Sequence, residues 1–278
     1  MKIYDCFPFY NEFELLELRL KSLWDVVDRF VIVEADRTQT NKPKPFYFWE
    51  RQNEFKEFFP KIRHLPVEMT IDFKGVGDWS IENAQRDAII YGLEDAAPDD
   101  LIMISDADEF PDPDVLQKIR GGQLVDPLNN TPLVMSQKFF CYYFDRIGEG
   151  SWYGTILVKL KNLTTPQELR DQRNILPRIS GGGYHFSYMG GVDCIRNKMT
   201  AIIEGPVLIA HLGEKIFDRK HIEECMAEGK GLYTGDEFLP YDVRNIRLPY
   251  LDEFLKKYPY FLREPEKYFG GKNFNEQR

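Results

Sequence analysis

The sequence has few cysteines, no long apolar run and no cluster of positive charge. Its cysteines are scattered, without a Cys-x-x-Cys pair or other metal-ligand spacing, which excludes the common cysteine-based metal sites and suits a reducing compartment. No window reaches the roughly 18 apolar residues of a membrane span, and the first residues lack a basic start followed by a long apolar stretch. We therefore expect a cytoplasmic protein without a transmembrane segment.

Charge excludes a second class of partner. The chain carries 45 acidic and 36 basic residues, a formal net charge of -9, and this balance repels nucleic acid and anionic membranes. The richest basic stretches, residues 42–44 and 256–257, are typical of a solvated loop and a helix face. We expect no nucleic-acid partner, so an anionic substrate has to be held by a specific site.

Strand patterns alternate with helix patterns in the first 110 of the 278 residues. We predict strands over 2–7, 29–34, 61–66 and 101–105, and helices over 12–24, 46–59 and 79–93. The later half is less regular, with strands predicted over 132–144 and 153–160 and helices over 193–203 and 218–229. This order favours an α/β fold with a mixed, mainly parallel sheet flanked by helices and a ligand crevice at the carboxyl ends of the strands.

Two aspartates follow the apolar run LIMIS directly, in the segment LIMISDADEF. In an extended segment Asp106 and Asp108 project to the same side. Two carboxylates at such a short distance raise one another's proton affinity. A hard divalent cation, Mn²⁺ or Mg²⁺, removes this conflict and bridges to a nucleotide diphosphate. The alternative is an acidic turn, since Asp is common there, but a buried strand running into the triplet favours function.

Six segments in this order resemble glycosyltransferase family 17, which includes the bisecting β-1,4-N-acetylglucosaminyltransferases. They are YDCFPFYNEFELLELRL, FVIVEA, NAQRDAI, ISDADEFP, WYGTILVKL and GGYHFSYMGG. The resemblance implies a GT-A fold of the Rossmann-like type, a UDP-sugar donor such as UDP-GlcNAc, and an inverting transfer that forms a β-linkage. It implies one catalytic domain over 1–250, with a donor-binding half over 1–115 and an acceptor-side half over 116–250, followed by a peripheral segment over 251–278.

The resemblance also implies roles for donor-side residues. Asp106 and Asp108 match the Asp-x-Asp pair that gathers metal and diphosphate. Asn11 and Glu12 follow the first strand, and Glu34, which ends the second, is a candidate contact to the ribose or base. Asn83 and Arg86 lie one helical turn apart and are candidates for the diphosphate or donor sugar, although Arg86 is as well explained by pairing with a nearby acid.

A third metal ligand and a general base are expected from the later half. His185, after three glycines, is the candidate ligand and favours manganese, with His211 as the competing choice and a purely structural histidine as the alternative. Inverting transfer needs a base that takes the acceptor's proton, and Asp145, Asp193 and Glu204 are candidates among which the sequence does not choose. Because no anchor is seen, a lipid-linked or polysaccharide acceptor is favoured over a glycoprotein core.

Three other functions are alternatives for a chain with these residues. A phosphohydrolase of the haloacid dehalogenase type also ends a strand in Asp-x-Asp, but there the motif lies near the start and is followed by Gly or Thr. A glycoside hydrolase needs two carboxylates about 5 Å or more apart on separate supports, which a pair two residues apart does not readily give. A non-catalytic glycan-binding protein is the third, and release of UDP from a donor with Mn²⁺ excludes it.

Overall fold

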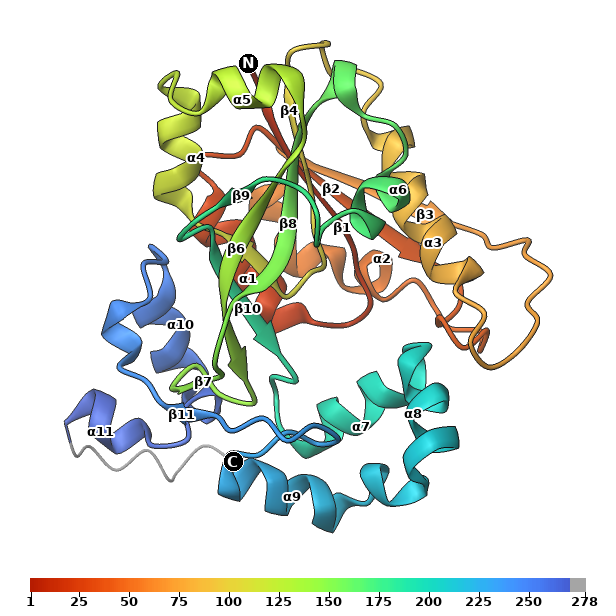
Figure 1. Cartoon of the computed structure of the whole chain (residues 1–278), viewed down its shortest axis with the longest axis vertical. Helices are drawn as coiled ribbons and strands as arrows, with labels where there is room; N and C mark the ends of the chain where they lie inside the picture. The colour runs from red at the N-terminus through yellow and green to blue at the C-terminus, as the bar shows by residue number, and fades with distance from the viewer. Residues whose placement is uncertain (271–278) are drawn as a thin grey trace.

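The structure, a computed structural model, describes residues 1–270 and is built on one mixed sheet (Figure 1). The strands of its main path follow the order β11-β7-β6-β8-β4-β1-β2-β3. Strands β3, β2, β1 and β4 run parallel, whereas β8 lies antiparallel between β4 and β6. Their bounds are β1 Ile3–Pro8, β2 Arg29–Ala35, β3 Ile62–Val67, β4 Leu101–Ile104, β6 Leu133–Cys141, β7 Arg146–Ile147, β8 Trp152–Lys159 and β11 Leu239–Pro240.

The central strands are buried on both faces, which explains their continuous apolar sequences. Successive residues of β1 alternate between two hydrophobic clusters: Ile3 and Phe7 join one, and Tyr4 and Cys6 join the other. The first cluster is covered by α1 (Phe13–Leu23), α2 (Tyr47–Arg51), η1 (Gln52–Phe58) and α4 (Pro113–Arg120), and the second by η2 (Ala88–Gly92) and α6 (Pro166–Asp171). The predicted α/β fold, a mixed sheet flanked by helices, is thus confirmed.

The later half of the chain extends the sheet and adds a helical layer. Strand β10 (Gly183–Ser187) pairs parallel with β6 and antiparallel with the short β5 (Glu109–Pro111). Helices α7 (Val192–Ala201), α8 (Glu204–Leu212) and α9 (Arg219–Glu228) gather below the sheet in Figure 1. The remaining elements are α3 Ser80–Asp87, α5 Val125–Asn130, β9 Arg178–Ile179, α10 Leu251–Lys257, α11 Pro265–Phe269, η3 Leu160–Asn162, η4 Glu214–Phe217, η5 Val243–Asn245 and η6 Pro259–Phe261.

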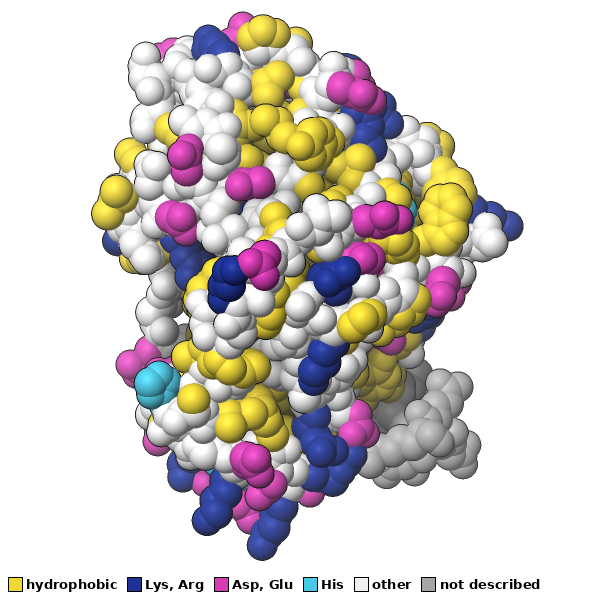
Figure 2. Space-filling view, turned by 90° about the vertical axis from the view of Figure 1, so that its right-hand side faces the viewer, with side chains coloured by type: hydrophobic (Ala, Val, Ile, Leu, Met, Phe, Trp, Pro, Cys, Tyr) yellow, Lys and Arg dark blue, Asp and Glu magenta, His cyan; other side chains and the backbone are white. Residues whose placement is uncertain are grey.

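The face in Figure 2 mixes Lys and Arg with Asp and Glu side chains, and hydrophobic side chains lie between them. Within residues 1–270 no helix combines the length and apolarity that a membrane crossing requires.

The prediction that residues 251–278 are peripheral is wrong for the first part of that segment. Helix α10 and the turn after it bury Leu251, Phe254, Leu255, Phe261 and Leu262 in one cluster with residues of β6 and β10. The sequence looked peripheral because polar residues separate these apolar ones, yet on a helix they share one face. The stretch 271–278 lies outside the described residues.

Truncation of Phe254 tests this docking. The ring is fully buried and packs 5.7 Å from the ring of Phe144, so Phe254→Ala should lower the free energy of unfolding by about 3–5 kcal/mol. The control, Glu253→Ala on the exposed side of the same helix, should change it by less than about 0.5 kcal/mol. Urea unfolding measures both, and equal small effects would show that the segment does not contribute to the core.

Candidate functional site

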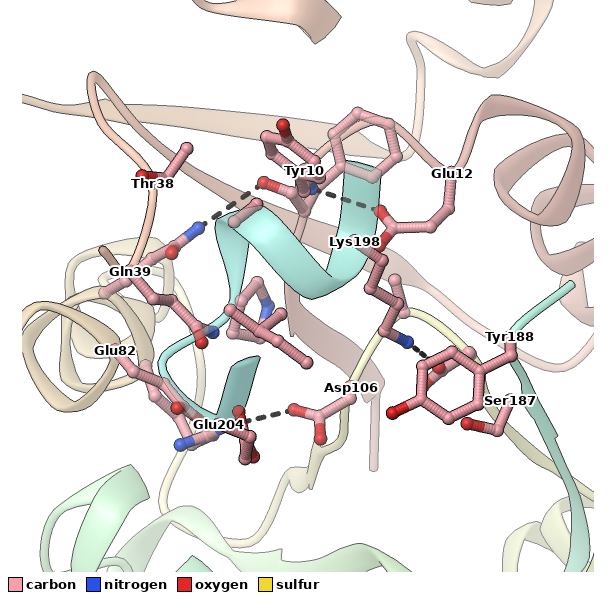
Figure 3. Close-up of a pocket in the computed structure, with 18 of the residues that line it drawn as sticks. Tyr10, Glu12, Thr38, Gln39, Glu82, Asp106, Ser187, Tyr188, Lys198 and Glu204 are labelled. Carbon is pink, nitrogen blue, oxygen red and sulfur yellow. Dashed lines mark hydrogen bonds and ion pairs between the residues drawn. The ribbon is translucent and has the colours of Figure 1, made fainter. Parts of the chain in front are cut away.

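A cavity of about 220 Å³ opens at the carboxyl ends of β1, β2 and β4 (Figure 3). The first half of the chain lines it with the loops after these strands and with one face of α3. The second half closes it from the other side with side chains of β8, β10, α7 and α8. The wall contains ionisable side chains of both signs: Glu12, Arg37, Lys44, Glu82, Arg86, Asp106, Asp108, His185, Lys198 and Glu204.

A buried arginine holds the Asp-x-Asp segment from below. Arg19 of α1 is completely buried, and its guanidinium donates to both carboxylate oxygens of Asp5 at 2.7 and 2.6 Å. Its other N–H groups donate to Ser105 Oγ and to the carbonyl oxygens of Asp106, Ala107 and Glu109. Because the main chain of this loop is bonded to Arg19 on its inner side, the Asp106 and Asp108 side chains line the cavity.

Asp106 is bound by two arginines. Arg86 Nη2 lies 3.0 Å from its Oδ1, and Arg170 Nη2 lies 2.5 Å from its Oδ2. Burial opposes ionisation, but the guanidinium groups of Arg170 and Arg86 hold the pKa of Asp106 well below its usual range. Glu109, fully buried, accepts from Arg170 at 2.6 and 2.9 Å and from Trp152 Nε1 at 2.6 Å. Glu109 therefore acts as a second counter-ion that fixes Arg170.

Asp108 has a different pair of partners. Lys198 Nζ lies 2.7 Å from its Oδ2, and His185 Nε2 lies 3.5 Å from its Oδ1. Burial again opposes ionisation, yet Lys198 and His185 keep the pKa of Asp108 well below its usual range. Burial also lowers the pKa of Lys198, but Asp108 and Glu12 outweigh it and raise that pKa. Asp108 and Lys198 are thus both charged at neutral pH.

Two of the three predicted metal ligands fit one ion. Ligand atoms about 2.1 Å from one octahedral ion lie roughly 3 Å apart, close to the 3.5 Å between His185 Nε2 and Asp108 Oδ1. The His185 ring lies 4.3 Å from that of Trp152, and its buried Nδ1 has no hydrogen-bond partner. Both oxygens of Asp106, in contrast, accept from arginines. Within residues 1–270 no three His, Cys, Asp or Glu residues gather as a metal site, so the metal stays a prediction.

Glu34 corrects one donor-side prediction. It is fully buried, does not line the cavity, and accepts from the Phe48 N–H at 3.1 Å and from His64 Nε2 at 3.0 Å. A carboxylate so enclosed cannot reach a ribose or base. The loop after β2 instead presents Thr38 and Gln39 to the cavity.

The other donor-side candidates differ in whether they line the cavity. Glu12 lines the cavity, and burial raises its pKa. Asn11 lines a smaller adjoining cavity, and Asn83 lines neither. Arg86 lines the cavity and also pairs with Glu82 at 2.8 Å, so the predicted pairing with a nearby acid is seen and a contact with the donor stays a prediction.

Of the three base candidates, Glu204 lines the cavity and Asp145 and Asp193 do not. Asp145 accepts the N–H groups of Arg263 and Glu264 at 3.1 and 3.2 Å, so it anchors the C-terminal segment away from the cavity. Asp193 is exposed and pairs with Arg219. Both predictions are therefore corrected. Glu204, at the first turn of α8, lines the cavity, and burial, then Glu82 and Asp106, raise its pKa.

Sequence reasoning missed Arg19, Arg170 and Lys198. Each is a single basic residue in an ordinary helical pattern, and no local signal distinguishes it from a solvated cation. Asp5 inside an otherwise apolar strand was the one available hint, because a buried carboxylate requires a partner.

A sequence model of glycosyltransferase family 17 matches residues 1–241, and the chain therefore belongs to this family of glycosyltransferases. The resemblance noted in the sequence is confirmed. The phosphohydrolase and the non-catalytic glycan-binding protein are not supported by this membership.

Similar curated proteins are the β-1,4-mannosyl-glycoprotein 4-β-N-acetylglucosaminyltransferases of Homo sapiens, Rattus norvegicus and Mus musculus. They are 33%, 33% and 32% identical over 109 residues, which is 36% of this chain and 20% of each relative. The match thus spans a fifth of those relatives. Among solved structures, 4-diphosphocytidyl-2C-methyl-D-erythritol synthase is similar over 65% of this chain and 89% of its own, with 15% identity and a TM-score of 0.36.

Replacement of Arg19 tests the support of the Asp-x-Asp loop. Arg19→Met leaves Asp5 as an unpaired buried charge, so the free energy of unfolding should fall by about 3–5 kcal/mol. Lys21→Met, which removes a partly exposed cation from the same helix, should cost at most about 1 kcal/mol. Denaturant unfolding compares the two, and a stability of Arg19→Met equal to that of the control would disprove the role of Arg19.

Proposed function

We propose that this protein transfers N-acetylglucosamine from UDP-GlcNAc to a hydroxyl of a glycan or glycolipid, with inversion, a β-linkage, a GT-A type of fold and dependence on Mn²⁺ or Mg²⁺. One observation carries the proposal: the Asp-x-Asp pair of a family 17 chain lines a cavity that also contains Arg86 and Lys198. Anionic and cationic groups in one cavity match a ligand that is bound through a metal and through its phosphates. The cytoplasmic location is part of the same proposal.

The cavity divides into regions suited to the parts of the donor. Tyr10, Thr38 and Gln39 lie at the edge formed by the loops after β1 and β2, and offer an aromatic ring, a hydroxyl and an amide to the nucleoside. Arg86 and Lys198 are cations placed to neutralise the diphosphate. Asp108 and His185 would hold the divalent ion, which supplies further positive charge to the leaving diphosphate when bound.

Glu204 is the proposed general base. It comes from the second half of the chain, which is the side expected for the acceptor, and Figure 3 shows it near Asp106 and Glu82. A carboxylate whose pKa is raised takes a proton from a hydroxyl more readily than an ordinary glutamate does. Glu204 accepts the acceptor's proton as the oxygen attacks, and UDP leaves from the opposite face.

Donor binding tests the role of Asp108. In the unchanged protein Mn²⁺ should strengthen UDP-GlcNAc binding about tenfold or more, because the ion links Asp108 to the diphosphate. In Asp108→Asn the affinity should be the same with and without Mn²⁺, while Asp193→Asn, outside the cavity, should behave as the unchanged protein. Calorimetry measures these affinities. Equal affinity with and without metal in the unchanged protein would contradict metal dependence.

Acceptor activation tests Glu204. Glu204→Gln should lower kcat by roughly 10²- to 10⁴-fold with little change in donor KM, because only proton transfer is lost. Since the pKa of Glu204 is raised, the carboxylate is protonated at a higher pH than an ordinary glutamate as the pH falls. The acid limb of the kcat profile should therefore lie above the usual glutamate range and vanish in Glu204→Gln. Retention of kcat within a few-fold, as expected for the exposed control Glu223→Gln, would eliminate Glu204 as the base.

A further inference from the structure

Lys198 lies beside Asp108, the carboxylate that the predicted metal would bind. Lys198 extends from α7 into the cavity, and its ammonium lies 2.7 Å from Asp108 Oδ2 (Figure 3). It also lies 5.7 Å from the ring of Tyr188. The carboxylate that would bind the ion is thus already neutralised by the protein itself.

The three cations that bind the Asp-x-Asp carboxylates are held differently. Arg170 is fixed by Asp106, by Glu109 and by the carbonyl of Gly154, and Arg86 is fixed by Glu82 and Asp106. Lys198 donates only to Asp108 among the hydrogen bonds found for residues 1–270, and its side chain is 27% exposed. An ammonium on a flexible four-carbon stem changes partner more easily than a guanidinium held at several N–H groups. Of these three cations, Lys198 is therefore the one best able to move.

A divalent ion on Asp108 and the ammonium of Lys198 repel each other strongly at such short range. The ammonium has to leave the carboxylate when the ion binds, and in a partly buried cavity it needs another anion. The donor diphosphate is the anion that arrives in the proposed function. Metal alone gains Asp108 but takes from Lys198 the carboxylate to which it is bonded, and leaves it only the weaker attraction of groups such as Glu12. Metal and diphosphate together satisfy both groups.

We propose that Lys198 is an exchangeable counter-cation, which occupies Asp108 in the donor-free protein and passes to the donor diphosphate when the metal takes Asp108. The proposal rests on the proposed function and adds a consequence to it. Metal and nucleotide must bind with positive coupling, because each removes the obstacle to the other. Lys198 sets the size of that coupling by lowering the affinity for metal alone.

Removal of the Lys198 ammonium should change the affinity for metal alone and the affinity for nucleotide in opposite directions. Lys198→Met should bind Mn²⁺ alone more tightly, by roughly 5- to 150-fold, the usual range of coupling between two ligands. The same variant should bind UDP more weakly in the presence of Mn²⁺. Both changes lower the coupling free energy between metal and nucleotide. Lys198→Arg, which keeps the charge, should keep the weak binding of Mn²⁺ alone. Lys220→Met removes the same charge from an exposed position on α9 and should match the unchanged protein in both measurements.

Calorimetry with UDP, and the electron paramagnetic resonance signal of free Mn²⁺, measure these affinities without any turnover. Opposite changes in the two affinities of Lys198→Met support the proposal. If the unchanged protein shows metal–nucleotide coupling but Lys198→Met binds Mn²⁺ alone no more tightly, the exchange is overturned and the proposed function stands. If the unchanged protein binds UDP equally with Mn²⁺ and with a chelator, the exchange and the metal dependence both fail. If it binds no UDP at all, the proposed function fails as well.

Discussion

The geometry of the site depends on the hydrogen bonds and the ion pair that the buried guanidinium of Arg19 makes. It joins α1 to β1 through Asp5 and to the loop after β4 through Ser105 and three main-chain carbonyls. A charge without exposure to water is tolerated only when all its donors are satisfied, and here the acceptors come from two segments that are about 100 residues apart in the sequence. The Asp-x-Asp loop is therefore part of the core on its inner side and part of the cavity on its outer side.

A second set of charged residues lies behind the Asp-x-Asp pair. Glu109 is enclosed beneath the cavity and holds Arg170, which in turn holds Asp106. Asp108, on the other side of Ala107, is paired with the ammonium of Lys198 and the ring of His185. The two aspartates of one short motif are thus unlike: one is bound by two arginines, and the other by an ammonium on a flexible stem and an imidazole.

Much of this fold was predictable because its signals are local. Strands β1, β2 and β4 are continuous apolar runs, and a strand buried on both faces needs no partner information to be recognised. The place of Asp106 and Asp108 at a strand end follows from the same pattern. Helix α10 was missed as core because its polar residues lower the average hydropathy, although Phe254 and Leu255 lie on one buried face.

Roles that depend on distant partners were predicted less well. Glu34, Asp145 and Asp193 are all carboxylates near predicted element ends, and nothing in the sequence distinguishes them from Glu204. The sequence by itself determined the α/β class, the family and the position of the Asp-x-Asp pair, since these follow from hydrophobic period and from order along the chain. Only the tertiary structure decided which charges meet, because Arg19, Arg170 and Lys198 lie 61 to 90 residues from the atoms they bind in the Asp-x-Asp loop. Electrostatic pairing depends on distance in space, and the chain's path through the sheet sets that distance.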